Sequence, residues 1–197
     1  MKNMPKNEII LGVAEGFGAS LKAPGHVIHT ANKQIRLGLI SKKRKGRKLE
    51  NIVSTWRSGG LKIEIYEDIE QLVWEKLLCN VTLSGPCSIF GCNVKGLLNN
   101  EEYWAFALNC MQEAYSIGLV KGILFSFEDP INYVTEFAKR VGSAKPSMLQ
   151  DFETKKKTEI DFINGAIPPL AAKYQIATPF NDHVCRVIHE AEKQLKA

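Results

Sequence analysis

The stretch from Trp74 to Ser84 constrains the fold more than any other part of this 197-residue chain. At helical pitch Lys76, Asn80 and Ser84 fall at i, i+4 and i+8, and apolar side chains cover most of the remaining circumference. A helix that is apolar on nearly every side has to be enclosed by other elements, so we expect a core built around it. A lysine in such surroundings is costly unless it meets an anion, which makes Lys76 a candidate catalytic residue. A lysine that snorkels at the helix edge is the alternative interpretation.

The order of the remaining elements predicts an α+β fold that is predominantly α. Residues 8–40 alternate like a small β meander, with a turn at Ala23-Pro24-Gly25 and a break at Asn32-Lys33. Such a meander is too small to hold a core alone, so we expect something outside this chain or a partner copy, as in a homodimer, to cover its edge. A helix is expected over 48–58, and from Asn99 onward the pattern is helical almost throughout.

Local signals mark where individual helices begin and end. Asp68 and Gln71 form a capping box that opens the helix described above, and Gly85-Pro86 should interrupt or kink it. Pro130 opens a later helix, which Gly142 ends.

Composition excludes several classes of function. We expect a cytoplasmic protein outside the membrane, because no apolar run of about 18 residues is present and the amino terminus lacks the apolar stretch of a signal peptide. The net charge is +5, and the basic run 42–48 lacks interleaved aromatic residues, which favours a solvated loop over a nucleic-acid site. The five cysteines are interpreted as reduced core thiols. No metal site is expected, because Cys87 and Cys92 have no His or Cys pair to complete a zinc set.

A glycine-rich stretch at residues 16–21 resembles a dinucleotide-binding turn only superficially. The third glycine is absent, and an extended segment follows where a helix should open. We therefore predict that this stretch does not bind phosphate.

A second polar constellation lies towards the carboxyl end. Ser147 and Gln150 form a capping box, so a helix should begin at Ser147, and Thr158 with Asp161 is spaced like a further helix start. We predict that the helix is broken near residues 153–157, which would let Ser147 and Glu159 converge on one site. The alternatives are helix capping for Ser147 and Thr158, and surface charge for Glu159.

Taken together, these blocks resemble the ketopantoate reductase (2-dehydropantoate 2-reductase) family, and the resemblance covers nearly the whole chain. The matching segments are Trp74-Glu75-Lys76-Leu77 with Asn80, Pro146 to Asp151, Thr158 to Gly165, Thr178-Pro179, and Pro24 to Val27. The family reduces ketopantoate, a 2-oxo acid, to pantoate with NADPH on the route to pantothenate. The resemblance implies a helical substrate-binding domain at 67–197, of the 6-phosphogluconate dehydrogenase carboxy-terminal type. Residues 1–66 would be the last strands of a truncated Rossmann domain with its basic loop.

By position, the resemblance implies roles for five residues. Lys76 matches the catalytic lysine that protonates the ketone oxygen, and Glu159 matches the carboxylate that engages the substrate and positions that lysine. Asn80, Ser84 and Ser147 match substrate-binding positions.

The chain also departs from the family pattern. Many members carry asparagine where Ser84 stands, which bears on substrate identity, and Pro168-Pro169 predicts a kink in a segment that is usually a continuous helix. The family's nucleotide fingerprint lies further upstream of the lysine than this chain extends. We therefore expect the carboxy-terminal portion of a reductase, which alone does not bind NADP(H) in the usual way.

Three hypotheses follow. The first is a ketopantoate reductase-like oxidoreductase, the second a reductase of another 2-oxo acid, and the third a non-catalytic helical module that dimerises.

Overall fold

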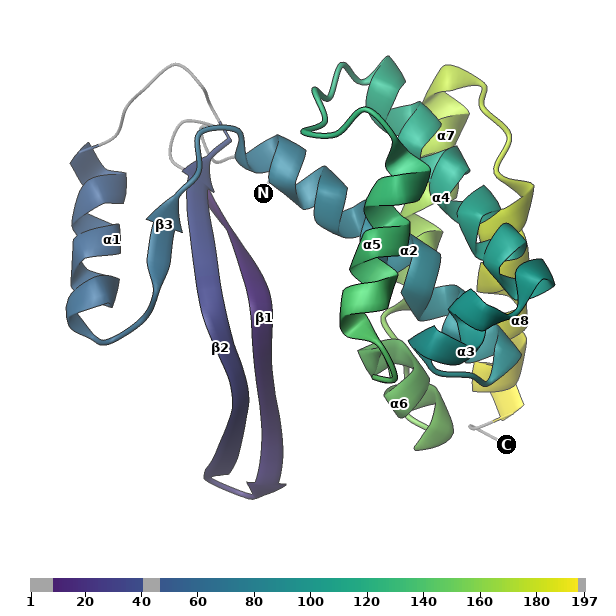
Figure 1. The fold of residues 1–197 in the computed structure, drawn as a ribbon, viewed down its shortest axis with the longest axis horizontal. Helices are drawn as coiled ribbons and strands as arrows, with labels where there is room; N and C mark the ends of the chain where they lie inside the picture. Colours follow the sequence, from purple (N-terminus) through teal and green to yellow (C-terminus); the bar gives the residue numbers. More distant parts are fainter. Residues whose placement is uncertain (1–8, 41–46, 195–197) are drawn as a thin grey trace. The chain divides into compact units, whose positions relative to one another are not determined.

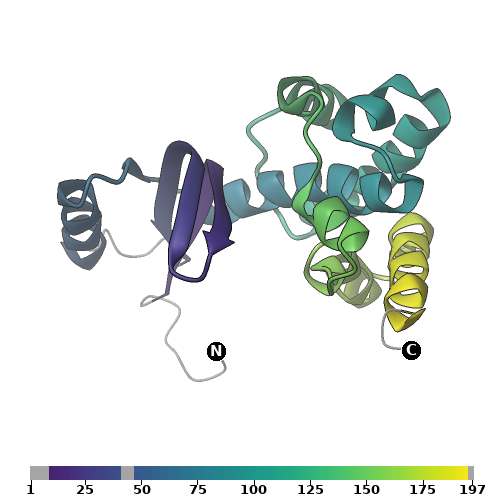
Figure 2. The same cartoon turned by 90° about the horizontal axis from the view of Figure 1, so that it is seen from below.

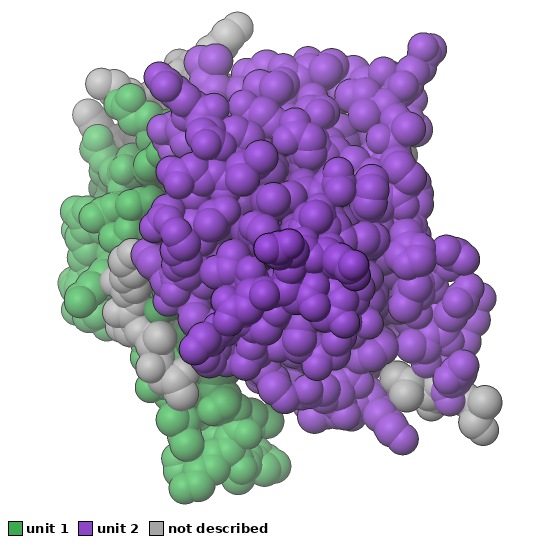
Figure 3. All heavy atoms as spheres, turned by 45° about the vertical axis from the view of Figure 1, so that its right-hand side comes forward, with its two compact units in different colours: residues 1–73 green, residues 74–197 purple. Residues whose placement is uncertain are grey.

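The computed structural model describes residues 9–40 and 47–194. Its contacts divide the chain into two compact units, residues 1–73 and 74–197 (Figure 3). The division falls inside helix α2 (Ile69–Phe90), so this long helix belongs to both units. The domain boundary inferred from sequence, between residues 66 and 67, stays a prediction. Most of the basic run lies at 41–46, outside the described residues.

Unit 1 is organised by a long antiparallel hairpin. Strands β1 (Ile10–Ala23) and β2 (His26–Leu39) meet at the predicted turn, where Gly25 has a φ of 77°, and β3 (Ile63–Ile65) pairs parallel to β2. The predicted break at Asn32-Lys33 is wrong, because the pairing with β1 continues through that position. A register shift between Gly18 and Ala19 absorbs the irregularity instead, as β-bulges do.

Small clusters of apolar side chains hold this unit together. Leu37 and Ile63 of the sheet pack against Leu49 and Val53 of α1 (Arg47–Ser58), the helix predicted over 48–58. Figure 1 shows α1 and β3 as neighbouring elements of this unit. A separate cluster joins Val13 of β1 to the first turns of α2, where Asp68 accepts a hydrogen bond from the Gln71 N–H at 3.2 Å. The predicted start of α2 is therefore confirmed.

Unit 2 is helical, and its other helices pack around α2 on several sides (Figure 2). Its remaining helices are α3 (Val94–Asn99), α4 (Glu101–Val120), α5 (Pro130–Val141), α6 (Ser147–Glu153), α7 (Ile167–Ala171) and α8 (Pro179–Gln194). Short 3-10 turns, η2 (Ile160–Phe162), η3 (Asn164–Ala166) and η4 (Ala172–Tyr174), connect them. The predicted start at Pro130 and the stop at Gly142, with φ 64°, are confirmed. The fold is α+β and predominantly α, as expected.

The larger of two clusters of buried side chains in unit 2 draws on most of its helices, and a second cluster gathers around Leu83, Val94 and Leu97. From α2 the larger cluster takes Trp74, Leu78, Cys79 and Val81, with Leu78 and Val81 fully buried. The other helices and turns contribute Cys110, Met111, Ala114, Ile117, Val134, Met148, Ile160, Ile163, Ile167, Ala171, Val184 and Ile188, among others. Burial of this much apolar surface is the main source of the unit's stability.

Helix α2 continues through Gly85-Pro86 to Phe90, so the predicted interruption does not occur. Pro86 lacks the N–H that would bond the Thr82 carbonyl, but the surrounding helices enclose this turn completely. Tertiary packing therefore outweighs the local preference. Pro168-Pro169 stands in the first turn of α7, where proline is tolerated, and the segment around it is divided into η3, α7 and η4.

No helix in the described ranges 9–40 and 47–194 is both long and apolar enough to cross a lipid bilayer.

Candidate active site

Three candidate residues share one stripe of α2, but they differ in burial. Lys76 is exposed, Asn80 is half-buried and Ser84 is only 6% exposed. The expectation that the lysine is enclosed by apolar neighbours is wrong, because the stripe opens towards solvent at its amino end.

A buried carboxylate fixes the turn that carries Lys76. Glu75 is 4% exposed and accepts a hydrogen bond from the Ser126 N–H at 2.7 Å, which ties α2 to the loop after α4. The Trp74 ring packs against Gly118 of α4, where the missing side chain lets α4 approach α2 closely. Nothing in the sequence marks Glu75 as buried, because acidic residues are rarely enclosed.

Helix α6 begins at Ser147 as predicted, but without the expected capping box. Pro146 is the N-cap residue and no side chain caps the helix, while the Gln150 side chain donates to the Lys145 carbonyl at 2.8 Å. The Ser147 side chain is exposed, whereas Met148 and Leu149 are 1% exposed and fasten α6 to the core. Ser147 thus stands at the amino end of a short helix that is held by the two residues after it.

The predicted break in the helix before Glu159 is confirmed. Helix α6 ends at Glu153, and Lys155 has a φ of 55°, in the left-handed region. The Thr158 N–H and hydroxyl both donate to Glu192 on α8, each at 2.7 Å, and Asp161 contacts His189 of α8 at 2.7 Å. Glu159 is exposed between these two anchored residues.

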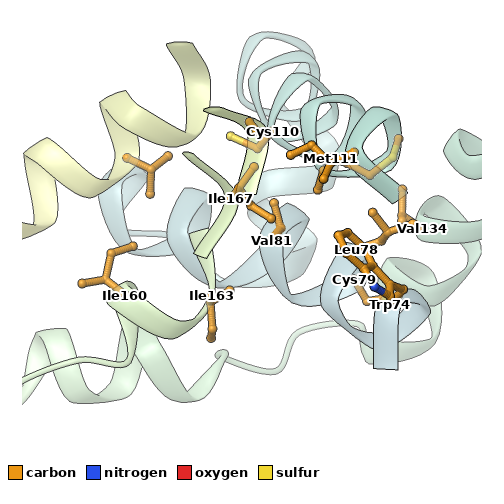
Figure 4. Packing of buried hydrophobic residues seen from close by; sticks show 14 of the residues in the cluster. Trp74, Leu78, Cys79, Val81, Cys110, Met111, Val134, Ile160, Ile163 and Ile167 are labelled. Carbon is orange, nitrogen blue, oxygen red and sulfur yellow. The ribbon is translucent and has the colours of Figure 1, made fainter. Parts of the chain in front are cut away.

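The elements that carry all five candidates pack on one core. Figure 4 shows Leu78 and Val81 of α2 in the same cluster as Ile160 and Ile163, which flank the turn after Glu159. Met148 of α6 belongs to the same cluster. The three segments therefore border the same core.

The two cavities described in unit 2 lie elsewhere. They measure about 400 and 450 Å³, one against α7 and α8 and the other against α5 and the loop before it. None of the five candidate residues lines either cavity.

Sequence reasoning missed a buried polar network beside the candidate stripe. Asn164 and Asn181 are both fully buried, and the Asn164 Nδ2 donates to the Asn181 Oδ1 at 2.9 Å and to the Val81 carbonyl at 3.1 Å. Asn181 in turn donates to the Cys110 carbonyl and to Glu113 on α4. Buried amides of this kind are hydrogen-bonded by necessity, but a lone asparagine gives no such signal in sequence.

The five cysteines are unpaired, and burial raises their pKa values. The pKa of Cys79 and of Cys87 is raised to about 12 and that of Cys185 to about 11, in each case mainly by desolvation. Among the residues placed in the structure, no group of three His, Cys, Asp or Glu side chains could hold a metal ion.

Comparison with known proteins places the chain among the ketopantoate reductases. The family model described as "Ketopantoate reductase PanE/ApbA C terminal" matches residues 68–192. A 2-dehydropantoate 2-reductase of Lactococcus lactis is 29% identical over 201 residues, covering 100% of this chain and 63% of the relative.

Solved structures agree on the fold. A PanE/ApbA family ketopantoate reductase from Ralstonia eutropha aligns with a TM-score of 0.86 at 19% identity, over 96% of this chain and 61% of that one. The ternary structure of D-mandelate dehydrogenase with NADH and anilino(oxo)acetate aligns with a TM-score of 0.85 at 25% identity, over 100% and 64%. The chain thus spans less than two thirds of the length of these proteins. On the match over residues 68–192, the chain belongs to the ketopantoate reductase family.

Proposed function

We propose that this chain carries the substrate-binding and proton-donating part of a 2-dehydropantoate 2-reductase-like oxidoreductase, an enzyme that reduces ketopantoate to pantoate. The observation that carries the proposal is the stripe of Lys76, Asn80 and Ser84 on α2, with the segments bearing Ser147 and Glu159 packed on the same core. The family match and the names of the relatives support the same activity.

Each candidate residue has a role that its chemistry suits. Reduction of a ketone leaves negative charge on its oxygen, which the Lys76 ammonium neutralises and then protonates. Lys76 is exposed, so a ligand reaches it without displacing core residues. Asn80 and Ser84 offer an amide and a hydroxyl along the same stripe, and the Ser147 hydroxyl holds the substrate. The Glu159 carboxylate accepts a hydrogen bond from the substrate and orients the lysine.

The nicotinamide cofactor NADP(H) that the family uses does not fit the described residues. A pyrophosphate needs a glycine-rich turn at the amino end of a helix. The Gly16-Phe17-Gly18 segment of this chain lies inside strand β1 instead. We therefore propose 2-oxo acid binding for this chain, with no dinucleotide site among residues 9–40 and 47–194.

A second candidate is a reductase of a different 2-oxo acid. The similarity to D-mandelate dehydrogenase, whose structure holds anilino(oxo)acetate, favours it, because that protein shares the fold and 25% of the aligned residues. Ser84 carries a hydroxyl where many ketopantoate reductases carry an amide, so the chemistry of this position differs from theirs. A binding competition between ketopantoate and aromatic 2-oxo acids separates the two.

Calorimetric titration with ketopantoate and pantoate tests the proposal. We expect binding that Lys76→Ala weakens by at least about tenfold, since a charge-assisted hydrogen bond is lost. Lys173→Ala, at another exposed lysine, should bind like the wild type. A chain that binds no 2-oxo acid and sediments as a stable dimer would instead favour a non-catalytic helical module.

A further inference from the structure

The amide of Asn164 links the helix that carries the candidate stripe to the segment that carries Glu159. The Asn164 Nδ2 uses both of its hydrogens, one on the Val81 carbonyl at 3.1 Å and one on the Asn181 Oδ1 at 2.9 Å. A carbonyl oxygen can only accept, so the amide nitrogen must face Val81. Asn164 is fully buried, and no other described side chain bonds this carbonyl.

The bond falls beside the turn of α2 that lacks one backbone hydrogen bond of its own. Val81 follows Asn80 directly, and its carbonyl lies one turn before Gly85 and Pro86. Pro86 cannot donate to the Thr82 carbonyl, so this turn has lost one bond of its own ladder. The donor from Asn164 supports the helix between the two substrate-binding positions, Asn80 and Ser84.

The Asn164 Oδ1 is buried without a hydrogen-bond partner and lies against Gly85. A Cβ built on Gly85 would stand 2.5 Å from this oxygen, so the side chain fills the space that the glycine leaves. A buried acceptor without a donor is destabilising, and such a group is unexpected in a role limited to stability. The two hydrogen bonds donated by the Asn164 Nδ2 therefore fix the position of the amide, even though its Oδ1 makes no hydrogen bond.

On the other side, Asn164 is five positions from Glu159 in a segment that is tied down at several points. Thr158 and Asp161 are anchored to Glu192 and His189 of α8, and Asn164 is anchored through Asn181 to the same helix. Only the Asn164 bond to Val81 joins this anchored segment to the backbone of α2 by a side-chain hydrogen bond among the described residues.

From these contacts we infer that Asn164 is a positioning residue, which sets Glu159 relative to Lys76, Asn80 and Ser84 without touching the ligand. This inference rests on the proposed function for the ligand-binding role of those four residues. The coupling of the two segments through Asn164 is independent of it.

The test compares Asn164→Asp and Asn164→Ala with Glu113→Gln in the full chain. Asn164→Asp keeps the shape but replaces the donor with an acceptor, and Asn164→Ala removes the amide without adding charge. Glu113→Gln is the matched control, because it disturbs the three hydrogen bonds that Glu113 accepts from Phe180 and Asn181 and leaves the bond to Val81 in place.

Hydrogen exchange reads the coupling directly. We expect both Asn164 variants to raise amide exchange about tenfold or more in residues 80–86 and 158–163 together. Glu113→Gln should raise exchange at the start of α8 and leave 80–86 as in the wild type. The inference is overturned if the Asn164 variants leave residues 80–86 unchanged, or if the control loosens them equally.

Pantoate titration at a temperature where all variants are folded adds the functional readout. We expect the dissociation constant to rise about tenfold or more in the Asn164 variants and to change by less than about twofold in Glu113→Gln. Equal weakening in the control overturns the positioning role, because loss of stability alone would then explain it. A wild type that does not bind pantoate refutes the proposed function, and the exchange result then decides the coupling alone.

Discussion

The carboxylate of Glu192 accepts two hydrogen bonds from Thr158, one from its backbone N–H and one from its hydroxyl, each 2.7 Å long. The two residues are 34 positions apart, so these bonds tie Thr158, the residue before Glu159, to the last helix. Because Glu159 itself is exposed, its place is set by what holds its neighbours rather than by contacts of its own side chain.

Replacing Thr158 with valine keeps the shape of the side chain but removes the hydroxyl's bond to Glu192 and the longer bond, at 3.3 Å, that it accepts from the Ile160 N–H. We expect the free energy of unfolding to fall by about 0.5–1.5 kcal/mol, the usual net value of a hydrogen bond. Urea denaturation measures this loss. Thr154→Val is the control, because that hydroxyl bonds only carbonyls within its own exposed turn. An equal effect in both variants would argue against a special role of Glu192.

Glu75→Ala should destabilise unit 2 by about 1.5–3 kcal/mol, since the carboxylate is buried and accepts a charge-assisted bond from the Ser126 N–H. Glu75→Gln keeps an acceptor and should cost less. Thermal unfolding of both variants gives the comparison. Glu190→Ala, at an exposed carboxylate, should change stability by no more than about 0.5 kcal/mol. A Glu75→Ala variant as stable as wild type would contradict the anchoring of this turn.

Gly38→Ala should destabilise unit 1 by about 1–3 kcal/mol through overpacking. The added Cβ would stand 2.5 Å from the Tyr66 carbonyl oxygen and 2.6 Å from the Ile69 Cβ, neither of which can rotate away. Gly59→Ala meets no atom closer than 3.4 Å and should be nearly neutral. Chemical denaturation followed by circular dichroism distinguishes them, and equal stability of the two variants would refute the close approach.

The free energy of unfolding should fall as the pH rises from 9 to about 12. Burial raises the pKa of Cys79 and of Cys87 from 9.0 to about 12. In that window the unfolded chain has released thiol protons that the folded chain still holds, so the unfolded state gains relative to the native one. Below pH 9 this contribution to stability is fully present.

Urea midpoints of the wild type and of a Cys79→Ala, Cys87→Ala double variant, measured at about pH 8 and about pH 10, test this linkage. The wild type should lose about 1–3 kcal/mol more than the double variant over the interval, because both its buried thiols contribute. Parallel losses in the two proteins would show that these thiols do not control the pH dependence.

The parts of the fold that follow from short-range chemistry could be read from sequence. Asp68 caps α2 and the helix before Glu159 ends near Lys155, each within a few residues of the signal that predicts it, whereas α6 starts at Ser147 without the capping box that predicted it. These features depend on backbone groups close to the signalling residue. Pro130 and Gly142 mark their helix ends for the same reason.

Features that depend on distant parts of the chain could not be predicted. Helix α2 passes through Pro86 because the other helices enclose that turn, and Asn164 reaches Val81 across 83 positions. The exposure of Lys76 has the same origin, because periodicity shows which residues share a face but not which part of that face another element covers. The roles of the candidate residues came from the resemblance to a family, and the structure adds the core on which their segments meet.

The anchors of α8 have a consequence for any shortened form of this protein. A chain that stops after Arg186 would retain every residue assigned to ligand binding, yet it would lack His189 and Glu192, the partners of Asp161 and Thr158. The loop around Glu159 would be released although its own sequence is intact. Loss of the second half of α8 would therefore disorder the segment around Glu159, about thirty positions upstream.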